Sequence, residues 1–554
     1  MNSIYEVRHL SEYYLSQQFG GKNEKKWSTF KHNGVIFAPI YEPHNIPIKY
    51  NGKSVTLPPL AEEYATLYSK YIDSEYIKNK VFSKNFFKSW KASIRGLGIE
   101  KIELCDFSDI IKYLERQQLK KKDMSKSDKE KCKVDKEKEE ESYKVAKVDG
   151  KDQPTGNFRI EPPGIFIGRG CHPKLGTIKV RTMPKDVTIN IGKGEKVPAL
   201  PAFYKNEKWG KVIHNNQAEW LASWKDTING KTKYVWLGNH SDFKARSDKD
   251  KFDKARKLGK HINKIRKENN DNIKNGNDKT KQLATALYFI DNLALRVGNE
   301  KGEDEADTVG VTSLRWEHIM LKENNTIKLD FLGKDSIRYV KVTSLSPDVY
   351  RNIESFLSGK GKGEDLFDLI NSTELNAYIK EFMPDFTAKV FRTFNASHTF
   401  QLELDLINEK FLNYKKDDKL DMLLSSYNTA NATVALLCNH QKAVSKGHDG
   451  AMEKLKDKMN EYKDKIKELL DDGSDKSKKK VKKLKEQIKK YKLKKEAKIE
   501  LKNISLGTSK TNYIDPRISV AFLKKHDIPV EKIFSQTLRD KFFWAFDITD
   551  DYHF

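Results

Sequence analysis

Short apolar segments broken by Pro and Gly dominate the first 119 residues, which is typical of a β-rich start. Residues 37–41 and 50–53 are the clearest of these segments. After the prolines at 58 and 59, apolar residues recur three or four positions apart, which predicts an amphipathic helix. Its apolar face consists of Leu60, Tyr64, Leu67 and Tyr71. Strand-and-turn composition returns at Ile160, so the N-terminal half is predicted to mix short strands with few helices.

Two further patterns follow along the chain. Residues 120–144 carry ten Lys and eight acidic residues with little apolar periodicity, and they are predicted to form an exposed helix or a linker. Near residue 240 the pattern changes to long amphipathic helices. One of these helices places four apolar side chains on a single face, as a buried helix requires. They are Leu283, Leu287, Ile290 and Leu293.

Heptad-like spacing sets residues 451–500 apart. Apolar residues recur at intervals of three and four on both sides of a polar turn at 471–474, which predicts an antiparallel coiled-coil hairpin. The residues of the seam are Met452, Leu455, Met459, Tyr462, Ile466 and Leu469, followed by Val481, Leu484, Ile488 and Tyr491. Nineteen Lys against eleven acidic residues give the segment a charge of +8. We expect a solvated spacer whose basic face can also approach a polyanion.

Composition narrows the class of protein. The chain has 554 residues, 37% of them apolar, which is enough for real cores and excludes a collagen, a disulfide scaffold or a wholly disordered chain. At about 150 residues per domain, this length suggests three or four domains. Lys and Arg exceed Asp and Glu by 104 to 79, a net charge of +25, which favours nucleic acid as the partner. A Lys-biased proteome would explain the charge alone equally well.

Cysteine and apolar content bear on the compartment. The four cysteines are scattered and lack the CxxC spacing of zinc modules, which indicates a reducing compartment. They are Cys105, Cys132, Cys171 and Cys438. No apolar run approaches the ~20 residues of a membrane span, and the N-terminus lacks the layout of a signal peptide.

Nucleotide and metal chemistry are not indicated. The glycine-rich segment 359–363 lacks the spacing of a phosphate-binding loop, and the glycines at 168 and 170 are not followed by a third. Cys171 with His172, and Cys438 with His440, are isolated pairs. The sequence therefore predicts no metal and no cofactor.

Two stretches present a basic residue at the end of an element. In the first, a helix is predicted to end with residues 293–300, which include Arg296, and Gly298 is its expected C-cap. In the second, alternating apolar residues on either side of 332–336 predict a β-hairpin with Lys334 at its tip. Taken singly these signals are weak, because a lone basic residue is most often a surface ion pair.

Three more residues complete the set. Arg392 lies in a helical segment, His440 follows the end of another, and Tyr513 stands in the final part of the chain. A lone helical His is most often a packing residue, and few of the 23 tyrosines could be nucleophiles. Tyr513 gains weight only from the residues that accompany it.

The ordered set Arg296, Lys334, Arg392, His440 and Tyr513 resembles the active site of eukaryotic type IB DNA topoisomerases. The sequence motifs around these residues also match that family. They are LALRVGNE, FLGKDSIRY, TAKVFRTFNAS, LLCNHQ and GTSKTNYIDPR, with EPPGIFIGRGCHPKLG in the N-terminal half. The resemblance extends from about Lys26 to Phe554, nearly the whole chain.

The chemistry of such an enzyme explains why these residue types are needed. Reversible cleavage of a phosphodiester without ATP needs a nucleophile that stores the bond energy in a covalent ester, and the phenol of Tyr513 can do so. Arg296 and Arg392 would clamp the phosphoryl oxygens and His440 would donate to a non-bridging oxygen. Lys334 would protonate the leaving 5′ oxygen as general acid. No metal is required, because the cations replace the ion.

The resemblance implies a complete activity. A 3′-phosphotyrosyl enzyme forms on one strand, the nicked duplex swivels, and the strand is rejoined, so that positive and negative supercoils relax without ATP or metal. The implied partner is duplex DNA, preferably supercoiled, with chromatin, replication and transcription proteins as further partners. The implied location is the nucleus, and a monomer with no membrane association is expected.

The resemblance also implies an architecture, an α+β multidomain fold that forms a clamp around DNA. Residues 1–240 would be a β-rich or mixed cap lobe with core subdomains I and II. Residues 241–446 would be core subdomain III, a mainly α-helical catalytic lobe similar to tyrosine recombinases. Residues 447–500 would be the coiled-coil linker, and residues 501–554 a small C-terminal domain that carries the nucleophile.

Further positions match the family's DNA contacts. Arg169, Asp335 and Asn512 match positions near the cleaved site. His172 and Lys174 match one lip of the clamp, opposite Asp304 and Glu305 on the other, which suggests an ion pair. The remaining matched DNA-binding residues are Lys389, Thr393 and Asn395.

Several features depart from the family pattern. The long charged N-terminal tail is missing, so nuclear targeting is expected from elsewhere, with the Lys-rich run 478–483 as one candidate. The coiled-coil linker is shorter than in animal enzymes. Thr429 and Ala432 stand where the family usually has Arg, and Ile167 and Cys171 also differ. None of these departures touches the five catalytic positions.

Three alternatives remain. A tyrosine recombinase shares the order of the five residues but usually has HxxR at the second Arg, whereas this chain has Lys389 before Arg392. A non-catalytic DNA-binding clamp would not need all five. A Lys-rich scaffold would explain the charge and none of the motifs.

Overall fold

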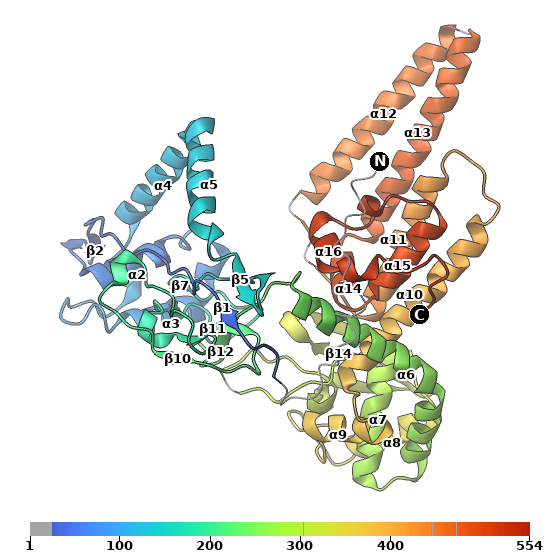
Figure 1. Cartoon of the computed structure of the whole chain (residues 1–554), viewed down its shortest axis with the longest axis horizontal. Coiled ribbons are helices and arrows are strands. Elements are labelled where there is room, and N and C mark those ends of the chain that lie inside the picture. The colour runs from blue at the N-terminus through green and yellow to red at the C-terminus, as the bar shows by residue number, and fades with distance from the viewer. Residues whose placement is uncertain (1–24, 303, 443, 446, 473) are drawn as a thin grey trace. The chain divides into compact units, whose positions relative to one another are not determined.

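The computed structural model describes residues 25–302, 304–442, 444–445, 447–472 and 474–554 (Figure 1). The chain forms two compact units. Unit 1 comprises Met1–Asp248 with Glu300–Thr308, and unit 2 comprises Lys249–Asn299 with Val309–Phe554. Of the five sheets formed by the described residues, four belong to unit 1, whereas unit 2 is mainly helical. The predicted α+β class, with sheets in the N-terminal part and helices in the C-terminal part, is confirmed.

The first layer of unit 1 packs helices on a small sheet. Its strands follow the order β3-β2-β4, and a turn at Asn51 and Gly52, both with positive φ, joins β2 to β3. A core of aromatic side chains, including Phe82, Phe86 and Trp90, fills the space beneath the helices. The elements are β2 (Ile48–Tyr50), β3 (Lys53–Val55), α2 (Pro59–Ser69), α3 (Lys80–Trp90) and β4 (Cys105–Asp106).

The second layer of unit 1 contains a four-stranded sheet of order β10-β9-β11-β12, a three-stranded sheet of order β1-β5-β6 and the pair β7-β8. Apolar residues of β9 and β11, such as Ile189 and Leu221, are buried in a second core with Trp27. The strands are β1 (Phe30–Lys31), β5 (Val145–Val148), β6 (Lys151–Pro154), β7 (Gly164–Ile165), β8 (Ile178–Lys179), β9 (Thr188–Asn190), β10 (Lys211–Ile213), β11 (Trp220–Lys225) and β12 (Thr232–Trp236). The prediction of strand-and-turn structure after Ile160 is confirmed.

The charged run of unit 1 forms exposed helix. Helices α4 (Ser108–Asp123) and α5 (Lys126–Glu141) cover nearly all of it, and α5 has no buried residue. The helix expected after the two prolines is α2. Tyr64 of its predicted apolar face is buried and Leu67 and Tyr71 pack against the same core, whereas Leu60 in the first turn is half exposed. Residues 37–41 form no strand.

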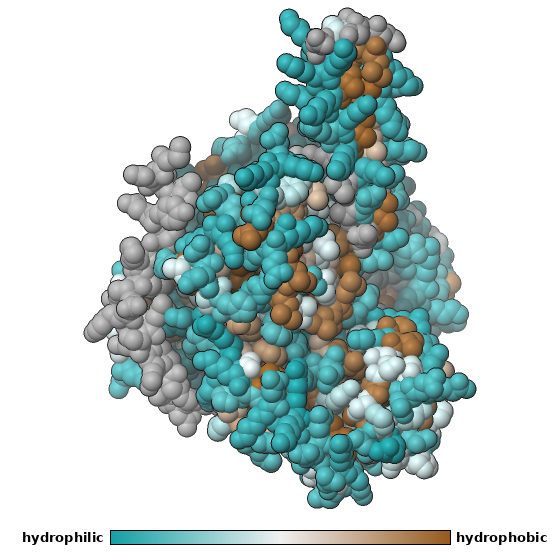
Figure 2. Space-filling model, turned by 90° about the vertical axis from the view of Figure 1, so that its right-hand side faces the viewer, coloured by the Kyte–Doolittle hydropathy of each residue, from teal (hydrophilic) through white to brown (hydrophobic). Residues whose placement is uncertain are grey.

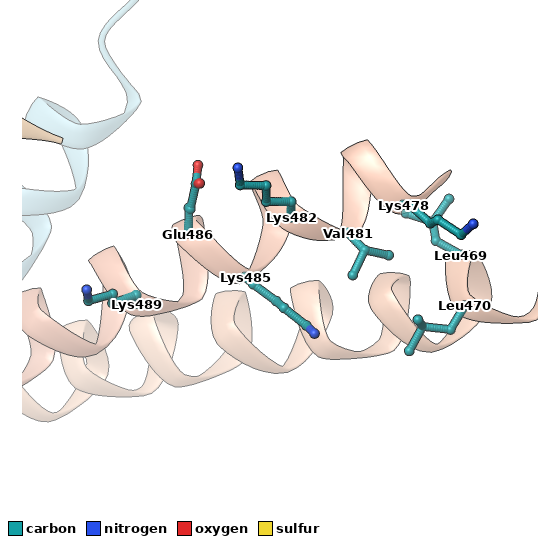
Figure 3. A pocket seen from close by; sticks show the side chains of 8 residues that line it. All are labelled: Leu469, Leu470, Lys478, Val481, Lys482, Lys485, Glu486 and Lys489. Carbon is teal, nitrogen blue, oxygen red and sulfur yellow. The ribbon is translucent and has the colours of Figure 1, made fainter. Parts of the chain in front are cut away.

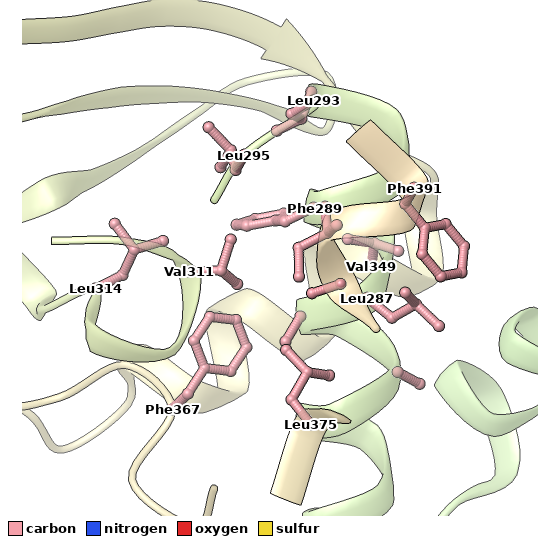
Figure 4. Packing of buried hydrophobic residues seen from close by; sticks show 14 of the residues in the cluster. Leu287, Phe289, Leu293, Leu295, Val311, Leu314, Val349, Phe367, Leu375 and Phe391 are labelled. Carbon is pink, nitrogen blue, oxygen red and sulfur yellow. The ribbon is translucent and has the colours of Figure 1, made fainter. Parts of the chain in front are cut away.

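Unit 2 is built around helix α7 (Asp278–Leu293), whose predicted apolar face is buried at Leu287, Ile290 and Leu293 (Figure 4). Unit 2 also contains a sheet of order β13-β14-β15 and several further helices, of which α8, α9 and α10 contact α7. These elements are α6 (Asp242–Asn275), which begins in unit 1, then β13 (Ile319–Lys322), β14 (Thr326–Leu332), β15 (Arg338–Ser344), α8 (Pro347–Leu357), α9 (Ser372–Phe382), α10 (Ala388–Phe411) and α11 (Lys419–Leu437).

The predicted hairpin and tail complete unit 2. Helices α12 (His448–Asp472) and α13 (Asp475–Glu500) run side by side, and Tyr462 and Tyr491 meet across them with ring centroids 5.6 Å apart (Figure 1). The turn between them lies partly outside the described residues. The tail folds into α14 (Leu506–Asn512), α15 (Pro516–Lys525) and α16 (Gln536–Lys541).

The face shown in Figure 2 is largely hydrophilic, with smaller apolar patches. Within the described residues, the longest helices are too polar for any of them to span a bilayer.

Candidate active site

Tyr513 stands in the short link between α14 and α15 and is 6% exposed. Its N–H donates to the Ser509 carbonyl at 2.9 Å, as the last bond of α14. Asp515 caps α15 by accepting from the Arg517 N–H at 2.9 Å, and the proline that follows Asp515 fits the first helical turn. The Ser397 hydroxyl of α10 donates to the Tyr513 carbonyl at 3.0 Å and accepts from the Asp515 N–H at 3.0 Å. The backbone on both sides of the tyrosine is therefore held.

The phenol of Tyr513 lies against two guanidinium groups. Arg296 Nη1 donates to Tyr513 Oη at 2.8 Å, and the Arg392 Cζ lies 5.1 Å from the centroid of the tyrosine ring. Arg392 is 5% exposed and donates from Nη1 to the Ala294 carbonyl and from Nη2 to the Cys438 carbonyl. Burial lowers the pKa of Arg392. Its Nε has no hydrogen-bond partner among the described residues, so one donor stays open for an anion.

The expected C-cap at Gly298 is wrong. Helix α7 ends at Leu293, and Ala294 takes the left-handed conformation, with φ at 51°. That conformation costs an alanine roughly 1 kcal/mol, and it directs the Ala294 carbonyl to Arg392. Gly298 also has a positive φ, of 89°, but for a different reason: a Cβ on Gly298 would lie 2.8 Å from the Gly310 Cα. The glycine is needed where two backbones meet, four residues beyond the cap.

His440 follows the end of α11, as the sequence pattern predicts, and it lies beside Tyr513. Asn439 takes the left-handed conformation, and the His440 N–H donates to the Ala435 carbonyl at 2.8 Å. Its ring centroid lies 5.1 Å from that of Tyr513. Nδ1 is 2.7 Å from the Ser509 Oγ, and Nε2 is buried with no partner among the described residues. The structure thus brings four of the five predicted catalytic residues together.

The charge state of His440 follows from its surroundings. Burial, followed by the charges of Arg392 and Arg296, lowers the pKa of His440 to about 3. The imidazole is therefore neutral at neutral pH and carries a proton on only one nitrogen. Ser509 is fully buried, and its hydroxyl touches Nδ1.

Lys334 is the fifth predicted residue, and the structure does not bring it to the other four. It lies at the tip of the β14–β15 hairpin, where Leu332 pairs with Arg338 and the Gly333 N–H donates to the Ile337 carbonyl at 2.8 Å. The predicted hairpin is confirmed. The Lys334 side chain is exposed and makes no ion pair or side-chain hydrogen bond with any described residue.

The DNA-contact candidates of unit 2 differ in exposure. Lys389, Asp335 and Asn512 are exposed. Thr393 is fully buried, with its hydroxyl donating to the Lys389 carbonyl at 3.3 Å. Asn395 is 9% exposed and donates to the Asp291 carbonyl at 2.6 Å. Both side chains form hydrogen bonds inside unit 2. In this structure they stabilise α7 and α10 and are not accessible to a ligand.

The candidates of unit 1 gather around one loop. Arg169 is exposed, and the His172 ring lies edge-on to Phe166 with centroids 4.7 Å apart. Burial, then the charge of Lys174, lowers the pKa of His172. Lys174 Nζ donates to the Ile228 carbonyl at 2.8 Å.

The expected ion pair with the segment Glu300–Thr308 is present within unit 1. Lys174 Nζ lies 3.0 Å from Asp304 Oδ2. Glu305 pairs instead with Lys231, a residue that sequence reasoning did not single out. Both pairs are at least partly exposed, so each contributes ~1 kcal/mol or less.

Sequence reasoning missed three residues that support the site. Ser397 and Ser509 contact Tyr513 and His440, and Ala294 supplies a carbonyl to Arg392. Ser509 stands four positions before Tyr513, one helical turn away, so its spacing was the one available signal. The sequence around Ser397 and Ala294 gave no signal, because the roles of both residues depend on contacts between residues that are distant in sequence.

Three parts of the chain are similar to known protein families. Residues 25–237 match the family described as eukaryotic DNA topoisomerase I, DNA binding fragment, and residues 240–473 match eukaryotic DNA topoisomerase I, catalytic core. Residues 485–554 match the C-terminal topoisomerase domain.

Full-length relatives give the same result. The chain is 44% identical to DNA topoisomerase 1 alpha of Arabidopsis thaliana, with 97% of this chain and 60% of that protein covered. It is 44% identical to DNA topoisomerase 1 of Caenorhabditis elegans (95% and 67% covered) and 41% identical to that of Homo sapiens (96% and 72% covered). The chain spans about 60% of the length of the plant relative.

Proposed function

Because the chain belongs to the eukaryotic DNA topoisomerase I family, we propose that it relaxes supercoiled duplex DNA by cutting and rejoining one strand. The observation that carries the proposal is the contact of 2.8 Å between Arg296 Nη1 and Tyr513 Oη, with Arg392 and His440 against the same ring. A phenol surrounded by cationic and neutral donors is suited to attack a phosphodiester.

The first step is attack by Tyr513 Oη on the phosphorus. A bond forms between the phenolic oxygen and phosphorus while the bond to the 5′ oxygen breaks, which leaves a 3′-phosphotyrosine and a 5′ hydroxyl. The phenol loses its proton to water during the attack, and the guanidinium of Arg296 stabilises the charge on Oη. Since the ester retains the energy of the phosphodiester, the 5′ hydroxyl can attack it to rejoin the strand without ATP.

The two open donors serve the non-bridging oxygens. Arg392 Nε and His440 Nε2 are both buried and lack partners among the described residues, which is costly unless a ligand satisfies them. Nδ1 of His440 lies 2.7 Å from the Ser509 hydroxyl, and when that hydroxyl donates to Nδ1 the single proton of the neutral ring lies on Nε2. His440 thus acts as a neutral hydrogen-bond donor, and Arg392 supplies the charge.

Lys334 is the proposed general acid for the 5′ oxygen. Its support is its position at a hairpin tip and an ammonium group that no described carboxylate engages. An alkoxide is a poor leaving group, so a proton donor within hydrogen-bond reach gains about 10²- to 10⁴-fold in rate. Bound DNA would bring the hairpin tip to the scissile phosphate.

The remaining parts of the proposal concern the whole duplex. Unit 1 and unit 2 would enclose the DNA as a clamp, and the catalytic part of unit 2 would be similar to tyrosine recombinases. The net charge of +25 supports a polyanion as the partner, and the cations at the tyrosine support chemistry without a metal. Rotation of the nicked duplex would then relax supercoils of both signs. Nuclear location, through the Lys-rich run 478–483, and work in replication and transcription complete the proposal.

The decisive experiment compares wild type with Tyr513→Phe on negatively and positively supercoiled plasmid, with EDTA and without ATP. We expect wild type to relax both signs, and the variant to bind DNA with unchanged affinity but relax neither, a loss of at least about 10³-fold. Trapping with denaturant should yield a DNA adduct on the 3′ phosphate in wild type alone.

Ser397→Ala is the matched control, because it loosens the backbone at Tyr513 but keeps the phenol. It should still form the adduct, at a reduced rate. Relaxation by Tyr513→Phe would refute the nucleophile, and a need for two synapsed duplexes would favour a recombinase.

A further inference from the structure

A groove of about 510 Å³ runs along the coiled-coil hairpin near its end (Figure 3). Its apolar lining comes from Leu469 and Leu470 near the end of α12 and from Val481 on α13. Lysines of α13 border it, namely Lys482, Lys485 and Lys489 among others. The groove lies far along the hairpin from α14 and Tyr513, and no part of the proposed chemistry uses it.

The apolar lining exceeds what the coiled coil needs. Leu469 belongs to the seam of residues spaced by three and four, but Leu470 is the next residue and stands outside that seam. Leu470 is 58% exposed, whereas Val481 is only 6% exposed. In Figure 2 apolar surface appears on the hairpin, bordered by hydrophilic surface. A leucine left open beside a groove gains free energy only when something covers it.

The charge around the groove is not balanced within the hairpin. Helix α13 has thirteen Lys and four acidic residues, whereas α12 has six Lys and eight acidic residues. Two carboxylates of α12 pair within α12: Glu461 contacts Lys458 and Lys465, and Asp464 contacts Lys467.

Four lysines of α13 and one carboxylate, Glu486, line the groove, so its lining carries a charge of +3. Lys482, Lys485 and Lys489 make no ion pair with any described residue. Their spacing of three and four residues places them on one face of α13, where like charges destabilise the helix slightly. A bound acidic group would remove that repulsion as well as add new ion pairs.

We propose that this groove docks an amphipathic helical segment of a partner protein, with large apolar side chains on one face and Asp or Glu beside them. The apolar side chains would cover Leu470 and its neighbours, and the carboxylates would meet the three lysines. Helix-in-groove recognition uses such anchors at intervals of three and four residues. Duplex DNA would satisfy the lysines but leave Leu470 uncovered, so the apolar lining favours a peptide.

The test measures binding of the full chain to a fluorescent helical peptide of about 18 residues with Leu on one face and Glu beside it, by fluorescence anisotropy. We expect Leu470→Ser and the double variant Lys482→Gln with Lys485→Gln each to weaken binding about fivefold or more. The double variant Lys479→Gln with Lys483→Gln removes the same charge from residues that do not line the groove, and it should bind like wild type. Plasmid relaxation should be the same in all these variants.

Three results would overturn the proposal. Equal weakening by both double variants would mean unspecific attraction to a basic helix. Undiminished binding to Leu470→Ser would mean that the apolar lining is unused. Competition by a DNA duplex that itself depends on Lys482 and Lys485 but not on Leu470 would make the groove a DNA contact. Because Leu470 is largely exposed, its replacement should leave the circular dichroism and melting temperature unchanged, which excludes misfolding as the cause.

Discussion

At the scale of single residues, Ser509 decides what His440 can do. The imidazole has one open nitrogen, Nε2, and one that contacts the serine hydroxyl at 2.7 Å. In a ring kept neutral by burial and by two arginines, the proton lies on Nε2 only if Nδ1 accepts a hydrogen bond. In the proposed mechanism, Ser509 is therefore a positioning residue for the donor His440.

We therefore expect Ser509→Ala to lower the rate of strand cleavage about tenfold or more and to leave DNA affinity unchanged. The imidazole ¹⁵N shifts of His440 should at the same time indicate a change of tautomer. A purely structural serine would lower the melting temperature without changing those shifts.

Ser397→Ala provides the contrast. Its hydroxyl binds the backbone at Tyr513 and Asp515 and does not contact the imidazole, so its loss should lower stability by ~1 kcal/mol and keep the tautomer of His440.

Two buried histidines make stability depend on pH. Burial lowers the pKa of His32 to about 4, and burial with the nearby arginines lowers the pKa of His440 to about 3. In the unfolded chain both return to about 6.5, so below that pH the unfolded state binds more protons than the folded state. The free energy of unfolding should thus fall as the pH decreases from about 7 to about 5, which urea titrations can measure.

The histidines and the carboxylates affect stability in different pH ranges. The pKa of Glu317 is lowered to about 2 by hydrogen bonds from Arg315 and the Gly363 N–H, against the effect of burial, so its contribution is lost mainly below about pH 4.5. The difference in the free energy of unfolding between pH 7 and pH 5 should be smaller in His32→Gln and in His440→Gln than in wild type. An unchanged urea midpoint from pH 7 to pH 5 in wild type would contradict the assignment.

At the scale of elements, two glycines hold the segment that carries Arg296. The Val311 N–H donates to the Arg296 carbonyl and the Thr312 N–H to the Val297 carbonyl, so the two segments run together. Gly298 and Gly310 permit this approach, because a Cβ on Gly310 would lie 2.4 Å from the Gly298 Cα. The contact of Arg296 with Tyr513 thus depends on backbone packing as well as on its own charge.

Gly310→Ala should therefore destabilise unit 2 by about 1–3 kcal/mol and slow strand cleavage more than DNA binding. Melting temperatures and single-turnover cleavage would measure the two effects. Gly450→Ala is a control, since a Cβ there meets nothing within 4 Å in helix α12, and it should be neutral or stabilising by up to ~1 kcal/mol. Equal effects of the two substitutions would refute the packing argument.

At the scale of the whole molecule, charge is the dominant property. A net charge of +25 predicts that affinity for duplex DNA falls steeply with salt, because each phosphate contact releases a counterion. We expect the affinity of Tyr513→Phe, which avoids covalent trapping, to fall at least about tenfold between 50 and 200 mM salt. Anisotropy titrations with a DNA duplex would measure the slope. A flat dependence would mean that the positive charge serves another partner.

The sequence by itself determined the elements whose cause is local. The spacing of Leu287, Ile290 and Leu293 predicted a buried helix, and alternation around Lys334 predicted a hairpin, because periodicity follows directly from side-chain direction. The candidate catalytic residues also came from the sequence, through the motifs around Arg296, Arg392, His440 and Tyr513. Each of these predictions depends on residues that are close together in the sequence.

Only the tertiary structure decided the features that depend on distant contacts. The cap at Ala294 is favoured by Arg392, 98 residues away, and Gly298 is required by Gly310. The pairing of Ser509 with His440 spans 69 residues, and Asn395 is buried by its bond to Asp291. Local propensity cannot register such contacts, because their free energy exists only once the chain has brought the partners together.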